Sequence, residues 1–443
     1  MEKYPRILIF GQPFNNFSGG GITISNLFKG WPKESIAVAS TWHALYKAST
    51  DVCSLYYLLG IEEQRWRFPF NLIQRSFPSG LMSFNTQQHI SKVPYKINIR
   101  RMLVDGIFYP FLHWFGLFHY LSKITLSQHF KEWLSEYQPE ILYIQVTSRE
   151  DVLFSIQLCD FLHIPSVIHN MDDWPSTISN KGLFKNYWRK KIDKEFRMLL
   201  NRMDLYLSIS DAMTAEYKKR YNKVFKAFHN PIDISKYTQI KNKPSEYDKT
   251  FRILYIGRIG LANKHSIYSF ANAISQQKND KYKIELDIFT YNTDTHDSKK
   301  ISNFKNIRIS PPVKHDMIPG LLTQYDLLLL PLDFTEAGFK YSQYSLPTKA
   351  SEYMISGTPI LVFAPKEAAI SKFCAENECG YCVTEQNKEK INSAVQFLIS
   401  NEEFRMKISR NAVRLATELF DGEKVRKEFQ QLIINMLKKE NYV

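Results

Sequence analysis

The sequence predicts an α/β protein made of two doubly wound domains in tandem. The chain has 443 residues, more than a single hydrophobic core usually serves, so two domains of roughly 200 residues each are expected. Short apolar runs bounded by turn-forming residues recur along it, as in strands buried on both faces of a parallel sheet. Helical stretches alternate with these runs, which is the order of elements in doubly wound domains. Two such domains leave a cleft between them, where small molecules commonly bind.

The first domain is expected to cover residues 1–236. Its predicted strands are Arg6–Phe10, Ser35–Ser40, Glu140–Val146, Pro165–His169 and Leu205–Ile209. A helix is expected to begin near Ile22, and later helices to cover Asp151–Leu162, Phe184–Arg202 and Asp211–Tyr221. The loop before the first helix ends in Gly19, Gly20 and Gly21. These glycines allow either close approach of the backbone to a ligand or a flexible turn, and they do not form the G-x-G-x-x-G fingerprint of dinucleotide binding.

Residues 53–130 interrupt the alternation and are rich in aromatic and basic side chains. The two densest segments are Arg65–Phe70 and Arg100–Phe118. Such mixtures suit an amphipathic surface that lies in a membrane interface. They also suit helices packed over one end of a domain, and periodicity does not separate the two interpretations.

The second domain is expected to cover residues 250–420, after a polar linker at 234–250. Its predicted strands are Phe251–Ile256, Ile284–Phe289, Ile307–Ser310, Leu327–Pro331, Ile360–Phe363 and Tyr381–Thr384. Residues 421–443 should contain a helix that packs on the body, because apolar residues recur at helical spacing over Gly422–Lys439.

The segment Tyr344–Ile360 predicts a loop and a short crossover helix between two buried strands. Pro347 suits a first helical turn, and Gly357 followed by a proline is a stop signal. The start of such a helix lies at the carboxyl edge of the sheet, where free backbone N–H groups attract anions. Lys349 and Glu352 are three residues apart and so share one helix face. They predict either a site for a diphosphate and a ribose or an ordinary surface ion pair.

Composition limits the class of partner. The net charge of +14 favours anionic partners, such as phosphorylated substrates or anionic lipid headgroups. Nucleic acid is not expected, because no long Lys/Arg run, zinc finger or RNA-binding aromatic signature is present. The N-terminal residues lead directly into a strand-like run rather than a signal peptide, and no apolar run reaches the roughly 20 residues of a membrane span. A cytoplasmic protein, free or peripheral at the inner face of the cell membrane, is expected.

The five cysteines predict reduced thiols, because nothing suggests a secreted protein. Cys374, Cys379 and Cys382 have a spacing that superficially suggests zinc. A fourth ligand is lacking nearby, so neither a metal nor a cofactor is expected.

Five motifs, in order along the chain, resemble those of the retaining glycosyltransferases of family 4, also called glycosyl transferases group 1. Besides the three glycines, which match the family's glycine-rich loop, they are Ile209–Met213 with Asn230–Asp233, Tyr255–Lys264, Tyr344–Ile360 and Asn411–Phe420. The resemblance implies the GT-B fold, in which two Rossmann-like α/β domains face each other across a cleft. Only residues 53–130 are not covered, and in this family that region varies with the acceptor.

The resemblance also implies roles for individual residues of a donor site in the second domain. Arg258 and Lys264 would hold the donor diphosphate, whose negative charge grows as it leaves. The backbone around Leu346, Thr348 and Lys349 would donate N–H groups to it. Glu352 would accept from the ribose hydroxyls, and the stretch around Val313 would contact the base. Enzymes of this kind need no divalent ion.

One position departs from the family's pattern. Tyr344 stands where the family often has the first glutamate of a Glu-x7-Glu motif, and Glu336 in the same loop is a candidate substitute. On the first domain, His169 resembles a strand-ending histidine close to the donor sugar and acceptor, although such a histidine is more often structural. Asp172 or Asp173 would orient the acceptor hydroxyl.

The function implied by the resemblance is transfer of a hexose from a nucleotide-diphosphate sugar to a glycan or lipid-linked acceptor. The context would be assembly of capsule, lipopolysaccharide or exopolysaccharide. The alternative is a non-catalytic peripheral membrane or scaffold protein that has kept the fold, which Tyr344 and the basic aromatic region favour. Arg258, Lys264, Lys349 and Glu352 argue against it, since a protein without catalysis has no need of all four.

Overall fold

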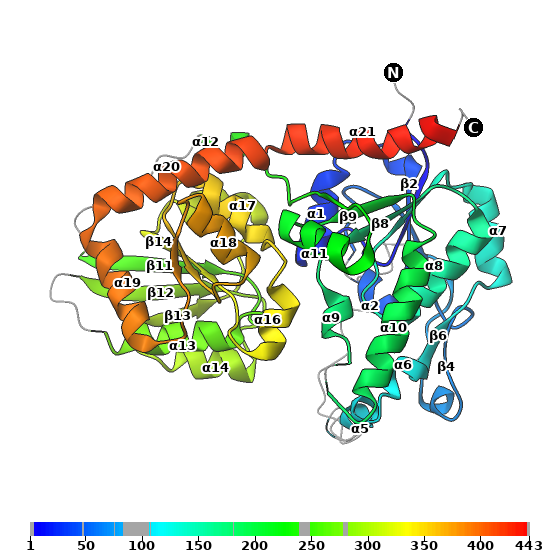
Figure 1. Cartoon of the computed structure of the whole chain (residues 1–443), viewed down its shortest axis with the longest axis horizontal. Helices are drawn as coiled ribbons and strands as arrows, with labels where there is room; N and C mark the ends of the chain where they lie inside the picture. Colours follow the sequence, from blue (N-terminus) through cyan, green and yellow to red (C-terminus); the bar gives the residue numbers. More distant parts are fainter. Residues whose placement is uncertain are drawn as a thin grey trace. The chain divides into compact units, whose positions relative to one another are not determined.

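The computed structural model describes residues 4–46, 48–74, 76–82, 106, 108–179, 181–238, 249–277 and 282–440. Its internal contacts divide the chain into two compact units (Figure 1). Unit 1 is formed by Met1–Ala227 and Phe429–Val443, and unit 2 by Phe228–Glu428. The first segment of unit 1 ends at Ala227, before the predicted end of the first domain at residue 236. Unit 2 ends at Glu428, after the predicted end of the second domain at residue 420.

Unit 1 contains a mostly parallel sheet with β1 in its interior. The strands are β1 (Ile7–Phe10), β2 (Ile36–Ser40), β3 (Leu55–Leu58), β4 (Gln64–Trp66), β5 (Gly80–Leu81), β6 (Ser122–Ile124), β7 (Ile141–Ile144), β8 (Ser166–Asn170), β9 (Leu205–Ser208) and β10 (Lys226–Ala227). The sheet order is β10-β9-β8-β7-β1-β2-β3-β5, and only the pairing of β3 with β5 is antiparallel. The chain runs outward from β1 first through β2 and later through β7, so the loops after β1 and β7 meet at the switch point.

Helices follow most of these strands. In the described residues of unit 1 they are α1 (Gly19–Leu27), α2 (Trp42–Leu45), α5 (Tyr109–Trp114), α6 (Phe118–Leu121), α7 (Gln128–Tyr137), α8 (Arg149–Leu162), α9 (Trp174–Thr177), α10 (Lys185–Leu200) and α11 (Asp211–Tyr221), with 3-10 turns η1 (Lys33–Ser35) and η2 (Phe70–Ile73). The prediction that the first helix begins near Ile22 was wrong. Ser18 caps α1 by accepting a hydrogen bond from the N–H of Gly21, so the glycines form its first turn.

The aromatic and basic region 53–130 contributes to unit 1 in two ways. β3 and β5 extend the main sheet, while β4 pairs with β6 in a separate antiparallel ribbon. α5 and α6 follow one another in a short helical corner. Of the predicted segment Arg100–Phe118, the residues before Gly106 and the residue Ile107 lie outside the described part of the chain.

Unit 2 is a second doubly wound domain, and its six predicted strands are confirmed. They are β11 (Thr250–Ile256), β12 (Lys283–Phe289), β13 (Ile307–Ser310), β14 (Leu327–Pro331), β15 (Ile360–Phe363) and β16 (Tyr381–Val383). The order is β13-β12-β11-β14-β15-β16 with parallel pairings throughout. Alternate residues of one strand enter two different cores. Ile253 packs with the helices on one face of the sheet and Leu254 with those on the other, which explains the continuous apolar runs.

The helices of unit 2 cover both faces of this sheet (Figure 1). They are α12 (Ser235–Thr238), α13 (Lys264–Ser275), α14 (His296–Ser302), α15 (Ile318–Leu322), α16 (Glu336–Ser342), α17 (Thr348–Ile355), α18 (Ala369–Glu376), α19 (Lys388–Ser400) and α20 (Glu402–Leu419), with the 3-10 turn η5 (His315–Met317). The predicted polar linker at 234–250 was only partly right, because α12 lies in it. The Ser235 hydroxyl donates to Asp233 at the start of this turn, and residues 239–248 lie outside the described part.

The C-terminal helix α21 (Gly422–Glu440) begins in unit 2 and ends in unit 1. In unit 2, the N–H of Gly422 donates to the carbonyl of Ile232. In unit 1, the Phe429 ring packs edge-on against Phe28 at a centroid distance of 5.1 Å. Gln430 donates to two backbone carbonyls at the end of α1. The predicted terminal helix is therefore present.

None of the described helices is long and apolar enough to cross a membrane. The five cysteines are free thiols, and the described residues contain no group of three or more potential metal-ligating side chains of the His, Cys, Asp or Glu type.

Candidate functional site

The loop after β11 presents Arg258 from a tightly bonded backbone. The Tyr255 hydroxyl donates to the carbonyl oxygen of Arg258 at 2.8 Å. The Asn263 side chain donates to the same carbonyl and accepts from the N–H of Gly260. The Arg258 side chain itself is exposed and forms no ion pair with any described residue. The loop therefore holds a free guanidinium at the carboxyl end of the sheet, available to bind two oxygens of a phosphate.

Lys349 brings a second cation to the same loop from α17. Its ammonium group lies directly over Gly257, where any Cβ would collide with Lys349 Nζ and Cε. Gly257 has a φ of +146°, a conformation that side chains disfavour. Lys349 Nζ also lies 5.2 Å from the centroid of the Tyr255 ring. Burial lowers the pKa of Lys349 to about 8, and the nearby Glu352 partly opposes that shift. An anionic ligand would restore the charged form.

Glu352 connects α17 to the segment after β13. Its Oε1 lies 3.4 Å from Nε2 of His315, and the Glu352 side chain is 12% exposed. The hydrogen bond to Glu352 raises the pKa of His315. Val313, two residues before His315, is partly buried at this edge. The structure thus brings together Glu352 and the stretch predicted to contact a base.

His315 was missed in the sequence. It directly follows the stretch Pro312–Lys314 at the end of a parallel strand, and this position alone could have indicated it.

The first turn of α17 has unpaired donors. Pro347 is the residue before the helix. Among described residues, the N–H groups of Thr348 and Lys349 have no hydrogen-bond acceptor. The Leu346 side chain is 7% exposed and packs in the core, and Asn230 donates to the carbonyl of Thr348 at 3.3 Å. These contacts fix the helix start and leave its N–H groups available to an anion.

Lys264 forms an ion pair, and its role in holding a donor diphosphate stays a prediction. It is the first residue of α13, and its Nζ lies 3.5 Å from Oδ2 of Asp297 at the start of α14. The first turn of α13 is already satisfied by Asp333, which is fully buried and accepts from the N–H of Ser266 at 2.9 Å. Burial raises the pKa of Asp333. The start of α13 is therefore occupied by a protein carboxylate, whereas the start of α17 is free.

Glu336 lies in the first turn of α16, not in a loop. Its side chain is 83% exposed and pairs with Lys340 at 2.6 Å. The helix itself is close to the Arg258 loop, because a Cβ on Gly338 would lie 2.7 Å from the carbonyl oxygen of Leu261. The structure places α16 beside the loop, while the Glu336 carboxylate is paired and solvated. Its role in place of the missing glutamate at Tyr344 stays a prediction.

In unit 1, Gly20 and Gly21 pack closely against the loop that precedes α1. None of Gly19, Gly20 and Gly21 has a positive φ. A Cβ on Gly21 would collide with the side chain of Asn15, and one on Gly20 would lie 3.3 Å from Oε1 of Gln12. The backbone of the first helical turn is thus held directly against the preceding loop, and the glycines are not a flexible turn.

In the structure His169 is buried, and the carboxylate of Asp173 is paired with Arg220. The His169 side chain is 1% exposed in β8 and its Nδ1 is hydrogen-bonded with the Tyr143 hydroxyl. Burial lowers the pKa of His169 to about 3, so the imidazole is neutral. Both oxygens of Asp173 are bound by Arg220, at 2.8 and 3.0 Å. The carboxylate of Asp173 is thus already paired, and the role of Asp172 or Asp173 in orienting an acceptor hydroxyl stays a prediction.

The edge of the unit 2 sheet thus gathers two cations, free helical N–H groups and a carboxylate from two separate segments, the loop after β11 and α17. This is the arrangement of a domain that binds phosphorylated small molecules. Residues 250–401 match the model of a protein family described as glycosyl transferases group 1. The predicted resemblance is thereby confirmed over the range that forms most of unit 2, while membership of family 4 stays a prediction.

Solved structures resemble the chain over nearly its whole length. Sucrose-phosphate synthase from Thermosynechococcus elongatus has a TM-score of 0.62 at 11% identity, over 98% of this chain and 99% of that one. HepE from Anabaena, in complex with UDP and glucose, has a TM-score of 0.58 at 13% identity, over 97% and 99%. WaaG, a glycosyltransferase involved in lipopolysaccharide biosynthesis, has a TM-score of 0.56 at 12% identity, over 97% and 99%. At these identities the similarity establishes the GT-B fold and nothing finer. No curated protein sequence matches this chain significantly.

Proposed function

We propose that the protein is a retaining, metal-independent hexosyltransferase that uses a nucleotide-diphosphate sugar. The observation that carries this is the convergence of Arg258, Lys349 and the free start of α17 on one sheet edge. Glu352, which pairs there with His315, would accept hydrogen bonds from a ribose. UDP is the first nucleotide to test, since HepE is solved with UDP and glucose.

The chemistry follows from the charge that develops on the leaving group. As the bond between the anomeric carbon and the diphosphate breaks, negative charge grows on the phosphate oxygens. Fixed cations and N–H donors aimed at those oxygens stabilise the transition state without a metal ion. The acceptor oxygen forms the new bond on the same face, and its proton passes to the departing phosphate. No carboxylate base is needed, and the neutral His169 contributes no charge.

The binding site is tested first by a thermal-shift screen of the full chain with UDP, GDP, ADP, TDP and CMP. Saturation at about a hundred times the dissociation constant adds roughly 2.7 kcal/mol, which is worth several degrees. The shift with one diphosphate should disappear in Arg258→Ala. Lys407→Ala is the matched control. Lys407 pairs with Glu378, which lies between α18 and β16 and therefore at the amino edge of the same sheet. A screen without any shift would favour the non-catalytic alternative.

Transfer is tested separately with the sugar conjugate of the nucleotide that binds. In the wild-type chain, transfer of the sugar to water instead of a glycan should be slow but measurable by chromatography. The released sugar should keep the anomeric configuration of the donor. This transfer should be abolished in Arg258→Ala and unchanged in Lys407→Ala. Nucleotide binding without hydrolysis or transfer to any glycan would count against an enzyme.

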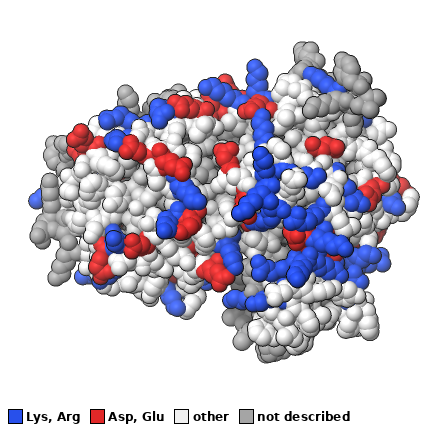
Figure 2. All heavy atoms as spheres, in the orientation of Figure 1, with Lys and Arg blue, Asp and Glu red and all other residues white. Residues whose placement is uncertain are grey.

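The acceptor in this proposal is a glycan carried by a lipid at the inner face of the cell membrane, in the synthesis of a surface polysaccharide. α5 exposes Phe111 and Trp114, at 51% and 59%. The neighbouring turn exposes Leu183 and Phe184, and the N–H of Leu183 donates to the carbonyl of Trp114 at 2.7 Å. This apolar tip lies beside α10, over which Lys and Arg side chains gather in Figure 2. Aromatic residues next to cations suit an anionic membrane surface.

Membrane contact is tested by sedimentation with phosphatidylglycerol vesicles and with neutral phosphatidylcholine vesicles. The wild-type chain should pellet with the anionic vesicles, and Trp114→Ser combined with Phe111→Ser should remove most of that binding. Phe397→Ser on α19 is the control for loss of an exposed ring, since Phe397 is 37% exposed in unit 2. Equal binding to both vesicle types would count against the proposal.

A further inference from the structure

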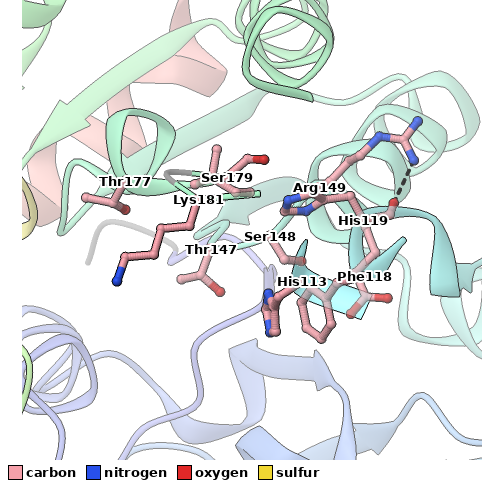
Figure 3. A pocket seen from close by; sticks show the side chains of 11 residues that line it. His113, Phe118, His119, Thr147, Ser148, Arg149, Thr177, Ser179 and Lys181 are labelled. Carbon is pink, nitrogen blue, oxygen red and sulfur yellow. Dashed lines mark hydrogen bonds between the residues drawn. The ribbon is translucent and has the colours of Figure 1, made fainter. Parts of the chain in front are cut away.

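A cavity in unit 1 is not used by the proposed donor site. Its volume is about 430 Å³, and it lies where α5 and α6 meet the start of α8 and the turn after α9. One wall consists of His113 and Phe118, and the opposite wall of Thr177, Ser179 and Lys181, with Thr147 and Ser148 between them (Figure 3).

Close backbone contacts hold the walls in place. A Cβ on Gly182, which has a φ of +103°, would meet the carbonyl oxygens of His113 and Trp114, so the turn after α9 is seated against α5. A Cβ on Gly116, with a φ of +66°, would collide with the Trp188 ring of α10. The cavity is therefore part of the packed structure and not a gap between loose segments.

The lining is aromatic on one side and polar but nearly uncharged elsewhere. The His113 and Phe118 rings stack at a centroid distance of 4.4 Å. Arg149 is neutralised by Glu195 through two hydrogen bonds of 2.7 and 2.6 Å. Burial lowers the pKa of His119 to about 4, so its imidazole is neutral. An anionic ligand would find only Lys181 as a free cation among the described lining residues.

Glu150, at the start of α8, supplies the second observation. The Glu150 side chain lines the cavity, while one of its carboxylate oxygens, Oε2, is buried away from solvent without a hydrogen-bond partner of good geometry among the described residues. Burial raises the pKa of Glu150 to about 7, so the carboxyl group can either donate or accept a hydrogen bond. Glu150 therefore contributes to the cavity lining a carboxyl group that is able to hydrogen-bond with a ligand hydroxyl.

We infer that this cavity binds a neutral hexose residue of the acceptor glycan, with Glu150 hydrogen-bonded to its hydroxyls and Phe118 against its apolar face. An aromatic ring suits the apolar face of a sugar ring, while a carboxyl group and several hydroxyl-bearing side chains suit its hydroxyl groups. The volume suits a single ring, since pockets for small ligands start at about 300 Å³. The inference rests on the proposed function, because it assigns the cavity to the acceptor of the same reaction.

The experiment is saturation-transfer NMR on the full chain with methyl glycosides of glucose, galactose, mannose and N-acetylglucosamine as probes. At least one glycoside should bind the wild-type chain. Its apparent affinity should fall at least tenfold in Glu150→Gln and in Phe118→Ala. Glu132→Gln, on the exposed face of α7 where Glu132 accepts a hydrogen bond from Gln128, should bind like the wild type.

The thermal shift with the donor nucleotide, measured on the same variants, separates the two proposals. An unchanged shift with lost glycoside binding supports the acceptor subsite, and an unchanged melting temperature of unit 1 in the same variants shows that the cavity is still folded. Glycoside binding that survives both substitutions, or no binding of any of the four probes to the wild-type chain, would overturn the inference. Glycoside binding without any nucleotide shift would support the cavity as a sugar site and reject the proposed donor site.

Discussion

At the scale of single residues, Lys349 should make both the stability of unit 2 and its affinity for a nucleotide depend on pH, in opposite directions. Its pKa of about 8 in the folded chain is below the 10.5 of a free lysine. Without ligand, the unfolded chain binds more protons between these two values, so unit 2 should become more stable as the pH rises from 8 to 10.5. A bound diphosphate favours the ammonium form, so nucleotide affinity should instead fall as the pH rises above 8.

We therefore expect UDP, or whichever diphosphate binds, to lose up to tenfold in affinity per pH unit above pH 8. Isothermal titration calorimetry between pH 7 and 9.5 measures this. Lys349→Met should bind more weakly and without that slope, because the titrating group is gone. A slope that persists in Lys349→Met would assign the titration to another group.

Gly257 offers a second test at the same scale. A Cβ there meets the Lys349 ammonium, and the positive φ adds backbone strain. Gly257→Ala should destabilise unit 2 by about 1–3 kcal/mol and weaken nucleotide binding, because Lys349 is displaced. Gly260→Ala is the matched control in the same loop, since its Cβ would have no neighbour within 4 Å. Equal melting temperatures of the two variants would contradict the packing described here.

At the scale of elements, the sequence predicted the strands better than the starts of helices. Continuous apolar runs such as Leu327–Pro331 have one interpretation in a doubly wound domain, and the strand found there has the predicted bounds. The start of α1 was misplaced because glycines were taken as loop residues, whereas the Ser18 cap determines the first turn. α16 was missed because only the Thr335 cap and the contact of Gly338 with Asp333 mark it.

The partners that define a site were the hardest to predict. Asp173 and Arg220 are 47 positions apart, and nothing local in either segment indicates the pair. Lys349 and Glu352 were identified by their spacing and by resemblance, and Arg258 by resemblance, but the pairing of Glu352 with His315 needed the folded chain. The cavity at Glu150 needed the packing of α5 against the turn after α9, which no sequence pattern encodes.

The ion pair between Asp173 and Arg220 links the start of α9 to α11. Its removal should therefore weaken the packing of these two helices in unit 1. The Asp173 side chain is 1% exposed, so its charge depends on Arg220 and on the Tyr217 hydroxyl, which donates to it at 3.0 Å. Breaking a buried pair by removing one partner costs about 3–5 kcal/mol. Arg220→Met should therefore lower the stability of unit 1 by about this amount in urea denaturation.

Arg197→Met is the control for that experiment. Arg197 pairs with Asp193 on the surface of α10, with both side chains at least 40% exposed, and it donates to the backbone carbonyl of Arg220, so its loss should cost about 1 kcal/mol, less than the loss of the buried pair. A similar loss of stability in both variants would mean that the buried pair contributes no more than a surface pair.

At the scale of the whole molecule, α21 begins in unit 2, and its residues from Phe429 to Glu440 belong to unit 1. Its residues Phe429 and Gln430 fill the space beside α1, where the Phe429 ring meets Phe28 and Tyr143. Phe429 is fully buried, and truncation of such a ring to Ala costs about 3–5 kcal/mol. Phe429→Ala should therefore lower the melting temperature of unit 1 by several degrees.

The same variant tests whether the two units melt independently. Because Phe429 contacts unit 1, the nucleotide-induced shift that reports on unit 2 should keep its size in Phe429→Ala. Leu419→Ala at the end of α20 is the control, since Leu419 is 44% exposed and its truncation should leave both transitions in place. Loss of the nucleotide shift in Phe429→Ala would mean that the donor site depends on unit 1 being folded, and the two units would then have to be treated as one cooperative body.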